Sequence, residues 1–144
     1  MAIFKCVNGN CVHYYNANKE QKGVAQITIF DASVPNRDMF SKSDVYVKIR
    51  VFGPVNANVG KTATVENNND PVFNTTFTTP EISKLSSVIF EVIDKDFRFD
   101  DFIASVFVSI DETDHKLPLK LAFPGGWIRV KLHWINRNGR NSIF

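Results

Sequence analysis

The sequence has little cysteine, little histidine and no long hydrophobic run, and each shortage excludes a class of protein. Its 144 residues include two cysteines and three histidines. No apolar stretch approaches the ~18 residues that a membrane-spanning helix needs. The histidines are scattered along the chain, and the sequence has no G-x-S-x-G motif, no phosphate-binding glycine loop and no catalytic Cys–His signature. The sequence therefore predicts a protein that is not an enzyme.

Net charge is also small, a formal +2 at pH 7, and too low by itself to argue for nucleic-acid binding. Hydrophobic residues make up 44% of the chain and charged residues 22%, which is near the globular average. This length allows one domain with a substantial core. We expect a single monomeric domain that does not bind nucleic acid.

The two cysteines, Cys6 and Cys11, enclose the segment VNGN, whose Asn-Gly pair is typical of a turn. A disulfide across this short loop would imply an oxidising compartment, and two free thiols in the cytosol fit equally well. A zinc site is disfavoured, because no second Cys/His pair has ligand spacing. The N-terminus lacks the apolar core of a signal peptide, so the protein is expected to be cytoplasmic or peripheral to a membrane, to leave by another route, or to begin after processing.

The chain is patterned for strands from about residue 23 onward. The strand candidates are VAQITIF, DVYVKIRVF, KTATVE, VFNTTFT, SVIFEVI, FIASVFVSI and WIRVKLHWI. Segments rich in Pro, Asn, Gly and Asp separate them, and only TPEISKL is a candidate for a short helix. We therefore predict an all-β fold, a single antiparallel eight-stranded sandwich over residues 23–136, with an N-terminal arm (1–22) and a C-terminal tail (137–144).

Two of these strands, DVYVKIRVF and WIRVKLHWI, alternate clearly between apolar and polar positions. In DVYVKIRVF one face carries Val45, Val47, Ile49 and Val51, and the other carries Tyr46, Lys48, Arg50 and Phe52. Lys48, Arg50, Arg129 and Lys131 all fall on polar faces. Such cations belong either to a solvated sheet face or to a basic patch for anionic lipid headgroups.

The segment VIDKDFRFDDFIA, residues 92–104, crowds four aspartates into eight positions: Asp94, Asp96, Asp100 and Asp101. Carboxylates this close repel one another unless a cation is present, which argues against a simple solvated turn. Calcium suits them, because it takes six to eight oxygen ligands in flexible geometry. An EF-hand is excluded, since its turn glycine would fall at Phe99 and its bidentate glutamate at Ser105.

A second loop, PNRDMFSKSDVYV, supplies further carboxylates. Asp38 and Asp44 bracket a hydrophobic tip formed by Met39 and Phe40, and Asp44 directly precedes a predicted strand. The segments MFSKSDVYVKI, KTATVENNNDPVFN and VIDKDFRFDDFIA together resemble the three signature segments of a C2 domain, the calcium-dependent phospholipid-binding β-sandwich. Within that family, TATVENNNDPVF and CVNGNC resemble the C2 domain of perforin most.

The resemblance implies calcium as the cofactor, in two or three ions, with Asp38, Asp44, Asp94 and Asp96 as ligands. The fifth ligand is Asp100 or Asp101, because the spacing here is one residue shorter than usual. The implied partner is an anionic phospholipid membrane, and the perforin likeness favours secretion.

Phenylalanines lie between the acidic residues of these loops, and they suggest a second role beside calcium binding. Met39, Phe40, Phe97 and Phe99 are the candidates for insertion into the bilayer, and Arg98 is placed to touch a headgroup. Phe102 leads into a strand and is expected in the core. The alternative function is a protein–protein interaction module that uses calcium only for stability or not at all, and a purely structural calcium site is a third reading.

Overall fold

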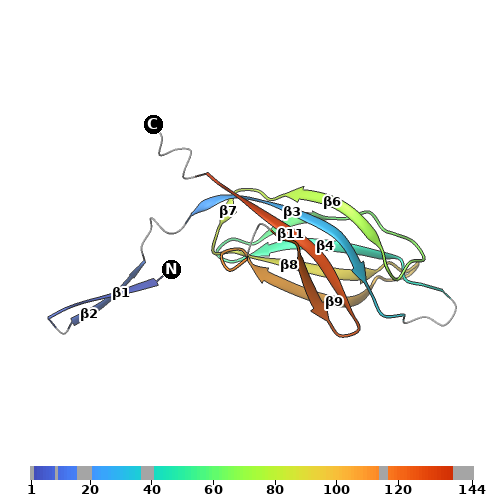
Figure 1. Cartoon of the computed structure of the whole chain (residues 1–144), viewed down its shortest axis with the longest axis horizontal. Helices are drawn as coiled ribbons and strands as arrows, with labels where there is room; N and C mark the ends of the chain where they lie inside the picture. The colour runs from blue at the N-terminus through green and yellow to red at the C-terminus, as the bar shows by residue number, and fades with distance from the viewer. Residues whose placement is uncertain (1, 9, 16–20, 37–40, 114–116, 138–144) are drawn as a thin grey trace.

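A computed structural model describes residues 2–8, 10–15, 21–36, 41–113 and 117–137 (Figure 1). Within these ranges the chain forms strands and turns, without a helix. The strands are β1 (Ala2–Val7), β2 (Asn10–Tyr15), β3 (Lys22–Ser33), β4 (Val45–Phe52), β5 (Ala57–Lys61), β6 (Val72–Thr78), β7 (Ile82–Ser83), β8 (Ser87–Asp94), β9 (Asp101–Ser109), β10 (Leu119–Phe123) and β11 (Gly126–Asn136). No described helix is long and apolar enough to cross a membrane.

Two antiparallel sheets form the body of the molecule. One has the order β10-β11-β3-β6, with β7 also paired to β3, and the other has the order β5-β4-β8-β9. Apart from the two-residue β7, the described strands of these sheets number eight and each has at least five residues. The predicted all-β sandwich is therefore confirmed.

The alternation predicted for β4 is what builds the core between the sheets. Its four inward valine and isoleucine side chains are fully buried and face the inward side chains of the other sheet. Those partners include Ile27, Ile29, Ile128, Val130 and Leu132. Phe90 of β8 is the largest fully buried side chain, and its removal from water stabilises the fold by roughly 1.5–3 kcal/mol.

One predicted strand, KTATVE, is wrong. The strand of this region, β5, ends at Lys61, and beyond it only Val65 forms an isolated bridge, with Val45. The hydroxyl of Thr62 accepts the hydrogen bond from the amide of Val47 at 3.0 Å. A side chain thus takes the place of a backbone acceptor, and the regular ladder stops there.

The short helix proposed for TPEISKL is also wrong. Ile82 and Ser83 form β7, which pairs with the start of β3, and Ile82 is buried in the core. Burial of this apolar side chain against the sheet outweighs local helix propensity. A further strand that the sequence pattern did not predict, β10, lies before the turn at Pro124 and Gly125.

The N-terminal segment forms a hairpin of its own, in which β1 pairs with β2. Its register places the backbone of Cys6 directly opposite that of Cys11. The disulfide between them remains a prediction, because the side chains of this hairpin lie outside the described set.

Candidate functional site

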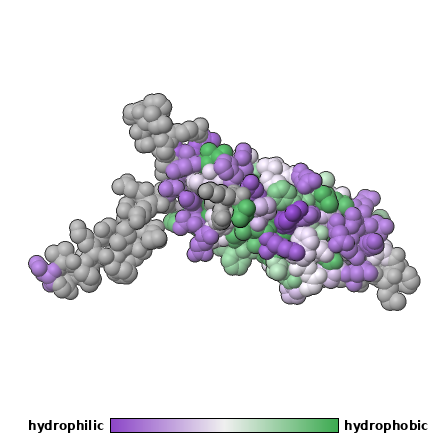
Figure 2. All heavy atoms as spheres, viewed as in Figure 1, coloured by the Kyte–Doolittle hydropathy of each residue, from purple (hydrophilic) through white to green (hydrophobic). Residues whose placement is uncertain are grey.

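One end of the sandwich gathers the carboxylates that the sequence singled out. The end of β3, the start of β4, the end of β8 and the start of β9 meet there, at the right of Figure 1. Figure 2 shows hydrophilic residues collected at the same end. A cavity of about 190 Å³ at this end is lined by Ser41, Lys42, Asp44, Asp94, Lys95, Asp96 and Asp101. Four predicted ligands from two loops, 50 residues apart in the chain, thus share one hollow.

Backbone contacts hold the two acidic loops together. The amide of Asp44 donates to Oδ1 of Asp94 at 2.9 Å, and the amide of Lys95 donates to the carbonyl of Asp44 at 2.7 Å. Oδ1 of Asp96 accepts from the amide of Phe97 at 2.5 Å. The first two bonds link the two loops, and the third lies within the second loop; each of the two carboxylates, Asp94 and Asp96, uses one oxygen in them.

The asparagine-rich segment ENNND supports the first loop from the side. The amide of Asn67 donates to Oδ1 of Asp44 at 2.6 Å, and its own side-chain oxygen accepts from the amide of Lys42 at 3.0 Å. Asn69 accepts from the amide of Ser43 at 3.0 Å. Asn67 has a left-handed backbone, with φ of 51°, which asparagine tolerates better than most residues. The resemblance to a C2 domain drew attention to this segment, but its role in positioning the first loop depends on contacts that the local sequence does not reveal.

Asp100 and Asp101 have different surroundings. Asp101 lines the cavity, whereas Asp100 accepts a hydrogen bond of 2.6 Å from the hydroxyl of Tyr46 on the outer face of β4. This bond, together with burial and the negative charge of Asp100, raises the pKa of Tyr46 from 10.0 to about 12. Asp101 is therefore the better placed of the two for a cation in the cavity.

The cavity is lined by cations as well as carboxylates, and one predicted calcium ligand lies outside the described residues. Asp38, Met39 and Phe40 lie outside the described residues. Within the described residues, which lack Asp38, no group of three or more His, Cys, Asp or Glu side chains is close enough together to hold a metal ion. Two cations, Lys42 and Lys95, also line the cavity and partly offset its carboxylates.

The aromatic residues of the second loop stand out from the surface. Phe97 is 98% exposed and Phe99 is 75% exposed, and Arg98 between them is exposed as well. Exposed side chains of this size cost solubility unless something covers them. Neither Phe97 nor Phe99 belongs to the core of the sandwich.

Phe102, by contrast, was expected in the core and is 57% exposed. The reason is a β-bulge: Ile93 pairs with Phe102 while the preceding residue, Val92, pairs with Ala104. The extra residue, Ile103, takes the inward position and is buried. A bulge reverses the alternation on one side of itself, so the strand pattern misplaces Phe102.

The cations on the sheet faces divide into paired and unpaired groups. Nε of Arg50 lies 2.5 Å from Oε1 of Glu91, and Arg129 makes two bonds of 2.9 Å to Asp31. Lys48 is exposed on the same face as Arg50. Each of the two arginines thus forms an ion pair with a carboxylate of its own sheet. This favours the interpretation that they belong to a solvated sheet face.

Comparisons with known proteins agree with this architecture. The model of the C2 domain family matches residues 23–124. A comparison with curated protein sequences found no significant match.

Solved structures resemble the chain at low sequence identity. Human GIVD cytosolic phospholipase A2, solved with an inhibitor and terbium chloride, is 19% identical over 81% of this chain and 18% of that one, with a TM-score of 0.68. The C2A domain of a plant extended synaptotagmin 1 is 18% identical over 82% and 98%, with a TM-score of 0.67. The calcium-bound C2A and C2B domains of extended synaptotagmin 2 are 23% identical over 81% and 46%, with a TM-score of 0.68.

These likenesses show the fold, and the chain matches only part of the larger proteins among them. It spans about a fifth of the phospholipase and about half of the two-domain synaptotagmin fragment. The comparisons do not show a particular closeness to perforin.

Proposed function

The chain belongs to the C2 domain family, a family of binding modules, and we propose that it binds calcium at its acidic end and then docks there on anionic phospholipid. The observation that carries this proposal is the juxtaposition of a cavity lined by four aspartates with two largely exposed phenylalanines on the adjoining loop. The acidic cavity supplies the charge for a cation, and the aromatic loop supplies the apolar contact for a membrane.

The donor set fits calcium in its chemistry. Asp44, Asp94, Asp96 and Asp101 offer carboxylate oxygens, and the loop backbone offers carbonyls, which are the ligands that this hard cation prefers. Asp38 is proposed as a further ligand and Asp100 as an outer residue held by Tyr46. Carboxylates that share one cavity repel one another, and the positive charge of two or three bound ions would offset that repulsion.

Charge decides when the domain can approach a membrane. An acidic loop is repelled by the negative surface potential of anionic lipid, and calcium removes this repulsion. Lys42, Lys95 and Arg98 would then lie close to the lipid phosphates, each contributing on the order of 1 kcal/mol. We propose Lys48 as an additional headgroup contact, and Arg50 only where it leaves Glu91.

Aromatic insertion adds the larger share of affinity. Full burial of one phenylalanine is worth roughly 1.5–3 kcal/mol. Phe97 and Phe99 are exposed already, so their insertion requires no unpacking of the core. Met39 and Phe40 are proposed to insert with them. A purely structural calcium site would leave this exposed pair unexplained.

Vesicle co-sedimentation tests the proposal. The full chain is pelleted with phosphatidylserine-containing or neutral vesicles across a calcium titration, beside a chelator control. We expect calcium-dependent pelleting that is lost in Asp94→Asn/Asp96→Asn and falls at least about tenfold in affinity in Phe97→Ala/Phe99→Ala. Matched controls are Asp111→Asn/Glu112→Gln and Val72→Ala, which change exposed residues outside the acidic loops.

The calcium midpoint also indicates the compartment. Extracellular calcium modules work at about 10⁻⁴–10⁻³ M and intracellular sensors at about 10⁻⁷–10⁻⁵ M. Absence of pelleting at millimolar calcium, in a wild-type chain that is folded, would refute membrane docking and favour a protein-interaction module.

A further inference from the structure

An exposed aromatic patch lies at the opposite end of the four-stranded sheet from the acidic loops. Phe52 at the end of β4 and Phe107 on β9 meet edge to face, with ring centroids 6.4 Å apart. Phe107 is 68% exposed, and Val55 in the adjoining turn is 65% exposed. Ile89 of β8 lies between β4 and β9 in the same row, opposite both Arg50 and Phe107. Phe52, Ile89 and Phe107 thus lie together on the outer face of the sheet, and Val55 is a further exposed apolar residue in the turn after β4.

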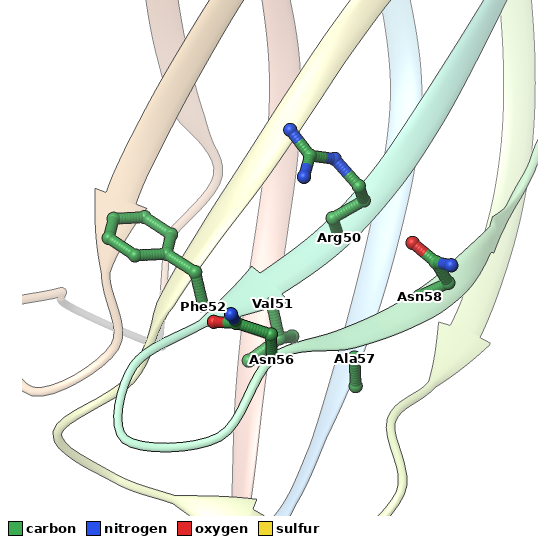
Figure 3. A pocket seen from close by; sticks show the side chains of 6 residues that line it. All are labelled: Arg50, Val51, Phe52, Asn56, Ala57 and Asn58. Carbon is green, nitrogen blue, oxygen red and sulfur yellow. The ribbon is translucent and has the colours of Figure 1, made fainter.

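A small cavity with hydrogen-bond donors adjoins this patch. It has a volume of about 190 Å³ and is lined by Arg50, Val51, Phe52, Asn56, Ala57 and Asn58. Figure 3 shows Arg50, Phe52 and Asn58 on the outer side of the β4–β5 ribbon, with the guanidinium and the Asn58 amide above the strands. Oδ1 of Asn56 accepts from the amide of Gly53 at 3.1 Å, which directs the NH₂ of Asn56 away from that bond.

The charges of this face favour an acidic partner. The outer face of β4, β5 and β8 carries Lys48, Arg50 and Lys61 against two carboxylates, Glu91 and, nearer the acidic loops, Asp100 bonded to Tyr46. Of these charged residues, only Arg50 lines the cavity. Glu91 engages Nε of Arg50, and the two terminal nitrogens of a guanidinium can donate further bonds. Planar guanidinium and amide donors recognise carboxylates well.

Position distinguishes this surface from the proposed membrane site. Strand β4 runs from Val45, beside the acidic cavity, to Phe52, and its eight residues span roughly 23 Å. A domain docked on lipid through its acidic loops would therefore leave this patch in solution.

We propose that the patch of Phe52, Ile89 and Phe107, with its cavity, binds an acidic–apolar segment of another protein: an aromatic or branched apolar side chain on the rings, and a neighbouring carboxylate at Arg50 and Asn58. The interaction is calcium-independent, and Arg50 is the one residue that it shares with the proposed headgroup contacts.

Peptide display on the full chain, with a chelator present, tests this inference. Random twelve-residue peptides are selected, and the enriched peptides are then titrated against isotope-labelled protein by NMR. We expect enriched sequences with Asp or Glu beside Phe, Trp, Leu or Ile, and shifts of amides in β4, β5 and β9 around the patch. Phe107→Ser and Asn58→Asp should each weaken binding by at least about fivefold, the second by placing a negative charge at the cavity.

Val72→Ser is the matched control, because Val72 is an exposed apolar residue on the other sheet and should leave binding unchanged. The proposal is refuted if no peptide is enriched, if enriched peptides lack acidic residues, or if their shifts map elsewhere. It is also refuted if Phe107→Ser abolishes self-association of the chain or lowers vesicle binding, since a second copy or the membrane would then be the occupant. Failure of calcium-dependent vesicle binding in the wild type does not affect this test.

Discussion

Removal of one hydroxyl group, in Tyr46→Phe, should both destabilise the fold and change its behaviour at high pH. The Tyr46 hydroxyl donates to Oδ2 of Asp100 at 2.6 Å, and the tyrosine itself is only 9% exposed. Phenylalanine keeps the ring, which Lys61 approaches to 5.7 Å, and removes only the donor. The substitution therefore isolates one hydrogen bond between β4 and the acidic loop.

The magnitude follows from the type of bond and its exposure. Hydrogen bonds to a charged group contribute about 1.5–3 kcal/mol when buried. Asp100 is exposed, so solvent screens part of this, and we expect a loss of about 1–2 kcal/mol in the free energy of unfolding. For a domain of this size that corresponds to a fall in Tm of about 3–10 °C.

High pH provides a second readout. The pKa of Tyr46 is raised to about 12 by its bond to Asp100, while in the unfolded chain it has the ordinary value of 10.0. The stabilisation is therefore complete below pH 10 and is lost as the pH rises from about 10 to 12. The wild-type chain should lose stability over that range more steeply than Tyr46→Phe.

Denaturant unfolding of a double-mutant cycle measures the effect. Tyr46→Phe, Asp100→Ala and the double variant are compared with the wild type, at pH 7 and from pH 9 to 12. We expect a coupling energy of about 1 kcal/mol at pH 7 that disappears near pH 12. A coupling energy within error of zero, or parallel pH profiles for wild type and Tyr46→Phe, would refute this account of the loop.

Three further predictions test the site and the core. Calorimetric calcium binding should fall at least about tenfold in Asp101→Asn and by less than about threefold in Asp100→Asn, because only Asp101 lines the cavity; equal losses would contradict that assignment. Phe90→Ala should cost about 3–5 kcal/mol in denaturant unfolding, since Phe90 is fully buried, and a cost under 1 kcal/mol would contradict its place in the core. Gly23→Ala should cost about 1–3 kcal/mol in the same assay, because an added Cβ would lie 2.1 Å from the carbonyl oxygen of Ile135; an unchanged midpoint would show that the strands separate freely there.

Most of the strands could be predicted from local pattern. The alternation in β4 and the apolar run in β8 predicted those elements nearly to their ends, and β6 coincides with VFNTTFT. The wrong predictions have local causes that alternation with a period of two residues does not reveal. Thr62 replaced a backbone acceptor and ended a ladder, and one extra residue beside Val92 turned Phe102 outward.

The sequence by itself determined that aspartates would emerge at strand ends, since Asp44 precedes an alternating strand and Asp94 closes another. Only the tertiary structure decided which carboxylates share a cavity and which are held elsewhere. Tyr46 and Asp100 are 54 residues apart, and Asn67 reaches Asp44 across 23. Alternation is a property of one strand, whereas these bonds depend on how neighbouring strands and loops are placed, which no single stretch of sequence encodes.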